Sequence, residues 1–238
     1  MARYGLATHV FVCRDEDYIV VLDLKQDRYF ALEAAKTAML ATVVPGWPVT
    51  AQQGTNAVVG KAAEEALRPL LRQGWLLEES TGAREATPVS VPRPETQLTG
   101  EGDSRSEKLG LRTLFAFVVA SVFARAALRF WPFDRVVRRV AQRKARYSSS
   151  NELLDLERAR RLIGAFERMR VFLFSTRDEC LHDSLAMLEF LAGYRIFPTW
   201  VFGVRARPFV AHCWVQHEDV VFNDTVEHVS TYVPIMAV

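Results

Sequence analysis

The stretch AHCWVQHEDVVFND, residues 211–224, predicts a β-hairpin. Side chains on a strand alternate between its two faces, so His212, Trp214 and Gln216 are expected to share one face and Cys213 to lie on the other. The polar tip HED predicts a turn, and the apolar VVF that follows predicts the second strand. We therefore expect the His212 face to line a cleft, with Trp214 in its wall and Gln216 as a candidate oxyanion donor.

The position of the turn determines which residues face each other across the hairpin. With Glu218 at the centre of the turn, His212 lies directly opposite Asp224, and their Cβ atoms are roughly 5 Å apart. A carboxylate at that distance can accept one imidazole N–H, fix the tautomer and stabilise an imidazolium. Cys180 can supply the missing nucleophile, so we expect a Cys-His-Asp triad in which Asp224 orients the base that deprotonates the thiol.

Cys180 is expected in the first turn of a helix, because STRD at residues 175–178 offers an N-cap and the helical pattern runs to about Ala192. Unpaired backbone N–H groups at a helix N-terminus favour a thiolate and can also bind an oxyanion, although Asp178 and Glu179 oppose the thiolate. The structural alternative is that Cys180 is a small buried hydrophobe. His212 would then be a core histidine.

The candidate metal ligands do not form a recognisable site. Cys180, His182, His212 and His217 lack the CxxC or HxxxH spacing that is typical of zinc ligands. We therefore expect neither a metal nor another cofactor.

Composition indicates a folded, soluble chain, since half of its 238 residues are hydrophobic and 24% are charged. The net charge of +2 is too small to indicate a nucleic-acid partner. Three cysteines, an odd number, do not form a disulfide framework, which favours a reducing, cytoplasmic compartment. No signal peptide is expected after Met1.

The most apolar run, Leu114–Leu128, is interrupted by Arg125 and falls short of the ~20 apolar residues of a membrane span. We interpret it as a buried core helix and expect no membrane contact. The alternative is an interfacial membrane helix, because a basic amphipathic helix follows at residues 133–146.

Residues 1–78 predict a small α+β module that resembles a winged helix. Three strands at Thr8–Cys13, Asp17–Leu24 and Asp27–Leu32 form a meander, and polar turns separate them. Two helical segments and a short strand follow. They lie at Ala34–Val44, from about residue 55 to Gln73 with a kink or break at Pro69, and from Trp75.

The third strand and the second helix of this module could instead accept a peptide as an added strand. An open strand edge supplies main-chain hydrogen bonds, and pockets beside an apolar helix select side chains. The candidate contact residues are Asp27, Arg28, Tyr29, Phe30, Ala31, Leu32, Leu67, Leu70 and Leu71. The simpler interpretation of the aromatic and leucine residues is that they form the core.

Residues 79–109, rich in Pro, Ser, Thr, Gly and Glu, predict a flexible linker. Residues 110–238 predict a second α+β domain of several helices followed by a strand at Thr199–Arg205 and the hairpin described above.

Three motifs of this second domain occur together in a known family. CLHDSLA begins at Cys180, GVRARPFVAHCWV begins at Gly203, and ND occupies residues 223–224. Together they resemble the leader peptidase of lasso-peptide biosynthesis, often called the lasso B protein. The resemblance covers residues 110–238 and implies a papain/transglutaminase-like cysteine protease fold with Cys180 as nucleophile, His212 as general base and Asp224 as orienting carboxylate.

Residues 1–78 are similar in strand–helix pattern to PqqD-like leader-recognition domains, in which the leader would add to residues 27–32 and lie against residues 62–71. The resemblance implies two partners, the leader of a precursor peptide and an ATP-dependent cyclase. We therefore expect a cytoplasmic cysteine peptidase that removes this leader. The alternatives are a transglutaminase or acyltransferase with the same triad, and a peptide-binding scaffold in which Cys180 is merely buried.

Overall fold

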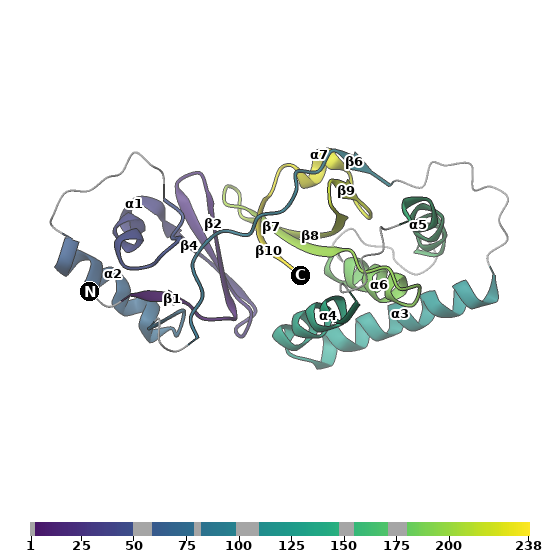
Figure 1. Cartoon of the computed structure of the whole chain (residues 1–238), viewed down its shortest axis with the longest axis horizontal. Coiled ribbons are helices and arrows are strands. Elements are labelled where there is room, and N and C mark those ends of the chain that lie inside the picture. The colour runs from purple at the N-terminus through teal and green to yellow at the C-terminus, as the bar shows by residue number, and fades with distance from the viewer. Residues whose placement is uncertain (1–2, 50–58, 79–81, 99–109, 148–154, 171–179) are drawn as a thin grey trace. The chain divides into compact units, whose positions relative to one another are not determined.

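The computed structural model describes residues 3–49, 59–78, 82–98, 110–147, 155–170 and 180–238. The chain forms two compact units that combine helices and strands, which confirms the α+β class (Figure 1). The first unit comprises Met1–Ser90, Gly203–Ala211 and Val233–Met236, and the second comprises Val91–Phe202, His212–Tyr232 and Ala237–Val238. The winged-helix resemblance and the domain limits at residues 78 and 110 remain predictions.

An antiparallel meander forms the base of the first unit, and it confirms the three strands expected from the sequence. It consists of β2 (Val10–Asp15), β3 (Tyr18–Asp23) and β4 (Arg28–Glu33), with β3 in the middle. Buried Asp23 closes the turn after β3, because its carboxylate accepts the backbone N–H groups of Lys25 and Gln26 and the indole N–H of Trp75. The strand order leaves β4 at an edge of this sheet.

The helices of the first unit differ in detail from the sequence prediction. The segment expected as one helix from residue 34 to 44 is a single α-turn, α1 (Ala34–Thr37), followed by the 3₁₀ helix η1 (Ala38–Thr42). The expected start of the next helix near residue 55 lies outside the described residues. From Val59 to Arg72 that helix, α2, is continuous, so the predicted division into two shorter helices at Pro69 is wrong, whereas the predicted kink stays a prediction. Pro69 lies in the last turn, so the one intrahelical bond that it removes, to the carbonyl of residue 65, is lost near the end of the helix and not at its centre.

A two-stranded sheet completes this unit. It pairs β1 (Tyr4–Leu6) with β5 (Leu76–Glu78), and only β5 was expected. One cluster of buried side chains includes residues of β1, β2, β3, α2 and β5, so the strands and helices share a single core.

Four helices dominate the second unit, and they confirm the helical segments expected there. These are α3 (Leu111–Phe130), α4 (Phe133–Tyr147), α5 (Leu156–Arg170) and α6 (Cys180–Ala192). Figure 1 shows α6 lying beside α3. Phe166 of α5 contacts both helices, because its ring packs edge-on against Phe117 of α3 and also contacts Phe190 of α6.

A five-stranded sheet lies against these helices, in the order β10-β7-β8-β9-β6. The expected strand β7 (Thr199–Arg205) and hairpin strand β8 (Val210–His217) are present, followed by β9 (Val220–Val221) and the short helix α7 (Val226–Val229). Two strands were not expected, the C-terminal β10 (Val233–Ala237) and β6 (Thr96–Gln97). β6 lies in the predicted linker and pairs in parallel with β9. Part of that linker therefore adds a strand to the sheet.

Helix α3 is not the buried core helix that its apolar composition predicted. Only 28% of its most apolar 18-residue window is buried, and Leu111, Phe115 and Val122 are 85%, 71% and 64% exposed. By length and composition α3 could cross a membrane. Its inner face, however, is packed inside the second unit, and the backbone carbonyl of Ser121 lies 3.1 Å from Nε2 of His182 on α6.

Candidate active site

Cys180 lies in the first turn of α6, as the sequence predicted, and its side chain is half-buried. The backbone N–H groups of a first helical turn have no intrahelical partner, and the helix dipole places partial positive charge there. A thiolate at Cys180 is therefore favoured over a neutral thiol. The predicted N-cap at residues 175–178 lies outside the described residues.

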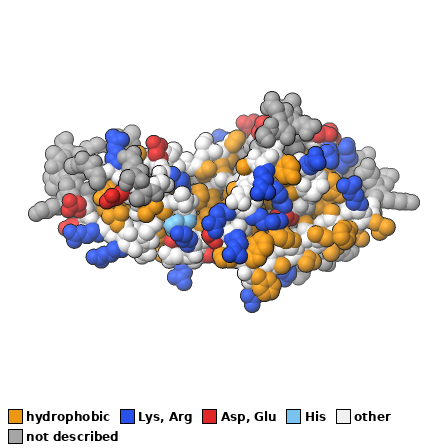
Figure 2. All heavy atoms as spheres, turned by 60° about the horizontal axis from the view of Figure 1, so that its bottom comes forward, with side chains coloured by type: hydrophobic (Ala, Val, Ile, Leu, Met, Phe, Trp, Pro, Cys, Tyr) orange, Lys and Arg blue, Asp and Glu red, His pale blue; other side chains and the backbone are white. Residues whose placement is uncertain are grey.

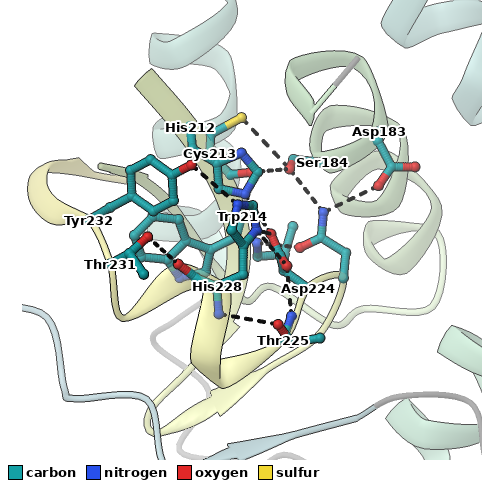
Figure 3. A network of polar contacts seen from close by, with 12 residues as sticks. Asp183, Ser184, His212, Cys213, Trp214, Asp224, Thr225, His228, Thr231 and Tyr232 are labelled. Atoms are coloured by element: carbon teal, nitrogen blue, oxygen red, sulfur yellow. Dashed lines mark hydrogen bonds and ion pairs between the residues drawn. The ribbon is translucent and has the colours of Figure 1, made fainter. Parts of the chain in front are cut away.

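His212 and Asp224 form the contact expected from the hairpin, with 2.5 Å between Nε2 of His212 and Oδ2 of Asp224 (Figure 3). The predicted register, however, is wrong by one residue. His217 pairs with Val220 and Gln216 with Val221, so the turn consists of two residues, Glu218 and Asp219, with Glu218 at φ +51°. A ladder continued in this register would place Asp224 opposite Cys213 rather than opposite His212.

The contact forms because the second strand ends at Val221 and the chain bends before Asp224. Asn223 holds this bend. Its side-chain oxygen accepts the backbone N–H of Val215 at 2.8 Å, and its amide nitrogen donates to Ser184 Oγ at 3.0 Å on α6. No sequence pattern indicates this role of Asn223, since the sequence shows only its place next to Asp224.

Asp224 has a second histidine partner that was not predicted from the sequence. Nδ1 of His228, on α7, lies 3.0 Å from both carboxylate oxygens, and the backbone N–H of Thr225 donates to Oδ1 at 2.7 Å. Nε2 of His228 in turn lies 3.2 Å from the hydroxyl of Tyr232. The one available signal was the spacing of four residues between Asp224 and His228, which brings side chains together only if a helical turn lies between them.

Cys213 lies beside the nucleophile, although it belongs to the strand face opposite His212. Its Sγ contacts Ser184 Oγ at 3.8 Å, one turn after Cys180 on α6, and its side chain is hydrogen-bonded to Cys180. Ser184 also donates to the backbone carbonyl of Cys213 at 3.2 Å (Figure 3). Residues from both faces of β8, His212 and Cys213, therefore form hydrogen bonds with the Cys180 thiol.

These contacts lower the pKa of the Cys180 thiol to about 4. The largest cause is the hydrogen bond from Cys213; burial opposes it, and the hydrogen bond and charge of His212 add to it. Burial alone would lower the pKa of His212, but hydrogen bonds to Asp224 and Cys180 and the charges of both raise it to about 9. A thiolate–imidazolium pair is therefore the stable form across neutral pH.

The pKa of Asp224 is lowered as well. Burial opposes this shift, but the hydrogen bonds from His212, the Thr225 backbone and His228 outweigh it. Asp224 thus stays ionised and can orient His212 throughout the range in which the ion pair exists. The arrangement has the parts of covalent catalysis by a thiolate: a nucleophile, a base beside it and a carboxylate that orients the base.

Three side chains of this network could also ligate a metal. One donor atom each from His212, Asp224 and His228 lies within 4.8 Å of the others, a grouping that the expected zinc spacings did not indicate. In the present arrangement both histidines are hydrogen-bonded to the carboxylate. A metal ion at this position would therefore displace the proton that links His212 to Asp224.

Trp214 does not form the wall of an open cleft, because it is only 1% exposed. It packs with Val201, Val221 and Val229 beneath the imidazole of His212, whose ring is nearly parallel to the indole at 6.1 Å. Gln216 is equally unavailable to an oxyanion, because its amide donates to the backbone carbonyls of Pro92 and Glu218. Both residues support the strand that carries His212.

The predicted peptide-contact residues of the first unit fall into two groups. Phe30, Leu32, Leu67 and Leu70 belong to the core: the two leucines of α2 are buried, and the two residues of β4 pack against the same cluster. The others reach the surface at least in part, namely Asp27, Arg28, Tyr29, Ala31 and Leu71. The ring of Tyr29 contacts Phe209 at 5.6 Å.

Comparison with known proteins gives one match. Residues 119–237, half of the 238-residue chain, match the transglutaminase-like superfamily. The matched range contains Cys180, His212 and Asp224. No curated protein and no solved structure matches the chain.

Proposed function

The chain belongs to the transglutaminase-like superfamily, and we propose that it is a cysteine peptidase that removes the leader from a ribosomally made precursor peptide of the lasso type. The observation that carries the catalytic part is the triad of Cys180, His212 and Asp224, with the pKa of the thiol far below its ordinary value. The resemblance of the three sequence motifs to lasso leader peptidases supports the substrate class.

The geometry supports a two-step hydrolysis. The Cys180 thiolate attacks the scissile carbonyl carbon, and the developing oxyanion is stabilised by backbone N–H groups at the start of α6. His212, protonated in the resting ion pair, gives its proton to the leaving amine as the C–N bond breaks. Neutral His212 then takes a proton from water as the water attacks the thioester. The C–S bond breaks, Cys180 leaves as a thiolate beside protonated His212, and the new carboxyl group of the leader loses its proton to solvent.

The first unit supports leader capture by strand addition. β4 lies at an edge of its sheet, and Phe30 and Leu32 of β4 share a core with Leu67 and Leu70 of α2. This common core fixes the edge strand and the helix relative to each other, as pockets between strand and helix require. The leader adds as a strand beside β4 and places a side chain near Leu71, which is 36% exposed on α2.

Two further elements of the proposal rest on the resemblance. The amine freed by cleavage is the substrate of an ATP-dependent cyclase that closes the lasso ring, so this cyclase is the expected protein partner. The reaction takes place in the cytoplasm, where the reducing environment keeps Cys180 as a thiol.

The test is mass spectrometry of a leader-bearing precursor incubated with the wild-type protein, with Cys180→Ala and with Cys13→Ala. We expect one cut with the wild type and with Cys13→Ala, which removes a buried thiol from β2, and no cut with Cys180→Ala. Leader binding should persist in Cys180→Ala. Cleavage by Cys180→Ala at the wild-type rate would exclude the mechanism.

The same assay separates the two alternatives. With a primary amine added in excess, a hydrolase still leaves a free carboxyl on the leader, whereas an acyltransferase leaves an amide adduct. If the wild type binds leader but cuts nothing, even with the cyclase added, the chain is a peptide-binding scaffold. A scaffold should also show slow alkylation of Cys180 at neutral pH.

A further inference from the structure

Helix α3 has two faces that differ in burial. The inner face packs in the second unit through Phe117, Ala120, Ser121, Ala124 and Ala127. The outer face carries exposed Leu111, Phe115, Val118 and Val122, spaced as one helical stripe. Arg125 and Arg129 continue the same stripe toward the C-terminal end of the helix. A 20-residue helix thus presents an exposed apolar stripe that ends in arginines.

The charge around this stripe is almost entirely positive. Residues 110–147 contain nine basic residues and one acidic residue, a net charge of +8, whereas the whole chain carries +2 and the remainder therefore −6. Arg143 and Lys144 turn inward, to Glu189 and Thr199. Seven arginines are exposed: Arg112, Arg125, Arg129, Arg135, Arg138, Arg139 and Arg146. The one acid, Asp134, is already paired with Arg138 at 2.6 Å.

Figure 2 shows hydrophobic side chains along this side of the second unit with basic side chains gathered beside them. Apolar and basic groups in this combination complement a surface that offers dense negative charge directly above an apolar layer. An anionic lipid bilayer offers both. Exposed Phe130, at the end of α3, adds an aromatic side chain of the kind found on the apolar face of helices that lie in a membrane interface.

Two other occupants fit less well. A second copy of the chain, docked face to face about a two-fold axis, would bring two surfaces of charge +8 together. A membrane crossing by α3 would require its inner face to leave α6, to which it is joined through Ser121 and His182. The helix is about 30 Å long and can lie flat in the interface with its outer stripe inserted while the inner face stays packed.

We propose that the outer face of α3 and the exposed arginines of α3 and α4 form a docking surface for anionic membrane. The surface holds the second unit on the bilayer, with the stripe Leu111, Phe115, Val118 and Val122 inserted among the lipids. This proposal is independent of the peptidase activity, because none of these residues belongs to the triad.

The test is co-sedimentation of the full chain with lipid vesicles. We expect the wild type to bind vesicles of phosphatidylcholine and phosphatidylglycerol in equal parts, and to bind pure phosphatidylcholine vesicles at least tenfold more weakly. Raising the salt concentration from ~0.1 M to ~1 M shortens the Debye length from ~10 Å to ~3 Å and should weaken binding to the anionic vesicles strongly.

Two double variants separate the apolar contribution to vesicle binding from the electrostatic contribution. Phe115→Ser with Val122→Ser should lower the partition coefficient by about tenfold or more, because two inserted side chains become polar. Arg129→Glu with Arg135→Glu should lower it by about 25-fold or more, at ~5-fold for each basic residue near an anionic surface.

Matched controls carry the same changes elsewhere. Val49→Ser with Leu156→Ser alters two exposed apolar residues, and Arg158→Glu with Arg161→Glu alters two exposed arginines of α5. Both controls should bind like the wild type, and every variant should keep the wild-type alkylation rate of Cys180 as evidence of folding. The proposal fails if the wild type does not bind anionic vesicles, if it binds neutral vesicles equally well, or if the controls weaken binding as much as the α3 variants. Self-association of the wild type through α3 without vesicle binding would likewise overturn it.

Discussion

At the scale of single residues, the ionisation of Cys180 and His212 is the feature on which the chemistry depends. The pKa of Cys180 lies at about 4 and that of His212 at about 9, so the ion pair exists between these values. We predict a bell-shaped kcat/KM profile with limbs near pH 4 and pH 9. The two apparent pKa values that these limbs report are properties of the coupled pair, not of Cys180 or His212 alone.

Alkylation by iodoacetamide measures the same pair without a substrate. The rate at Cys180 should rise near pH 4 and then stay level, whereas an ordinary thiol reacts about tenfold faster for each pH unit up to about 8.5. Cys13 is an internal control, because burial and the charge of Asp15 raise its pKa to about 12. A Cys180 rate that follows the ordinary thiol curve would contradict the ion pair.

A second residue-scale prediction concerns Cys213, which no sequence pattern linked to the nucleophile. Cys213→Ala removes the hydrogen bond that contributes most to the low pKa of Cys180. We expect the acid limb of the alkylation profile to move up by about one pH unit or more, equivalent to ~1.4 kcal/mol for each unit. Cys213→Ser keeps a donor at this position and should restore most of the shift. If the acid limb of Cys213→Ala stays at the wild-type pH, His212 and the helix N-terminus are sufficient to lower the pKa of Cys180.

At the scale of elements, the hairpin shows both what the sequence could predict and where it failed. Alternation along residues 211–217 predicted the face of His212, and the partnership with Asp224 was correct. The predicted register was wrong because the polar sequence HED is equally compatible with a turn of two residues and a turn of three. The contact survives because the strand ends after only two residues, and the bend depends on side-chain hydrogen bonds of Asn223 that no periodicity encodes.

Helix α3 shows a different limit. Its sequence is apolar on nearly every side, so the pattern of residues does not reveal which face is buried. Burial was predicted from composition, whereas the packing partner α6 covers only one face. Likewise β1, β6 and β10 are short, and each exists through pairing with a strand distant in sequence. The local meander of β2, β3 and β4, by contrast, was predicted in full because adjacent strands and polar turns specify it.

The bend at Asn223 supports a prediction at this scale. Asn223→Ala leaves the buried backbone N–H of Val215 without its acceptor and removes the link to Ser184, a cost of about 1–3 kcal/mol in the free energy of unfolding. Because Asp224 is the next residue in the chain, loss of the bend should move its carboxylate away from His212. We therefore expect kcat to fall at least tenfold and the acid limb of Cys180 alkylation to move to higher pH.

The control for this variant is Gln97→Ala. Gln97 also accepts a backbone N–H near α7, that of Val226 at 2.8 Å, but it does not hold the bend. It should lower stability slightly and leave both kcat and the alkylation limb unchanged. An Asn223→Ala protein that is destabilised but has wild-type kcat and alkylation would assign Asn223 a purely structural role.

At the scale of the whole molecule, the two units divide the proposed task between leader capture and bond cleavage. The triad lies entirely in the second unit, and the proposed leader contacts of β4 and α2 lie in the first. A substrate held by one unit is presented to the other within the same molecule, at an effective concentration in the mM range for a short flexible connection. The cleft around Cys180 can therefore bind the cleavage sequence weakly and still act on the intended precursor.

This division predicts that cleavage depends on the leader through KM more than through kcat. A truncated peptide that contains only the residues around the scissile bond should show a kcat/KM at least 100-fold lower than the full precursor. Leu71→Glu places a charge on the exposed part of α2. It should lower the kcat/KM of the full precursor to nearly that of the truncated peptide. It should leave cleavage of the truncated peptide unchanged. Val49→Glu, at an equally exposed residue (36% for both) of the same unit, is the matched control and should behave like the wild type. If Leu71→Glu slows both substrates equally, the effect lies in the catalytic unit, and the first unit is not the site that selects the leader.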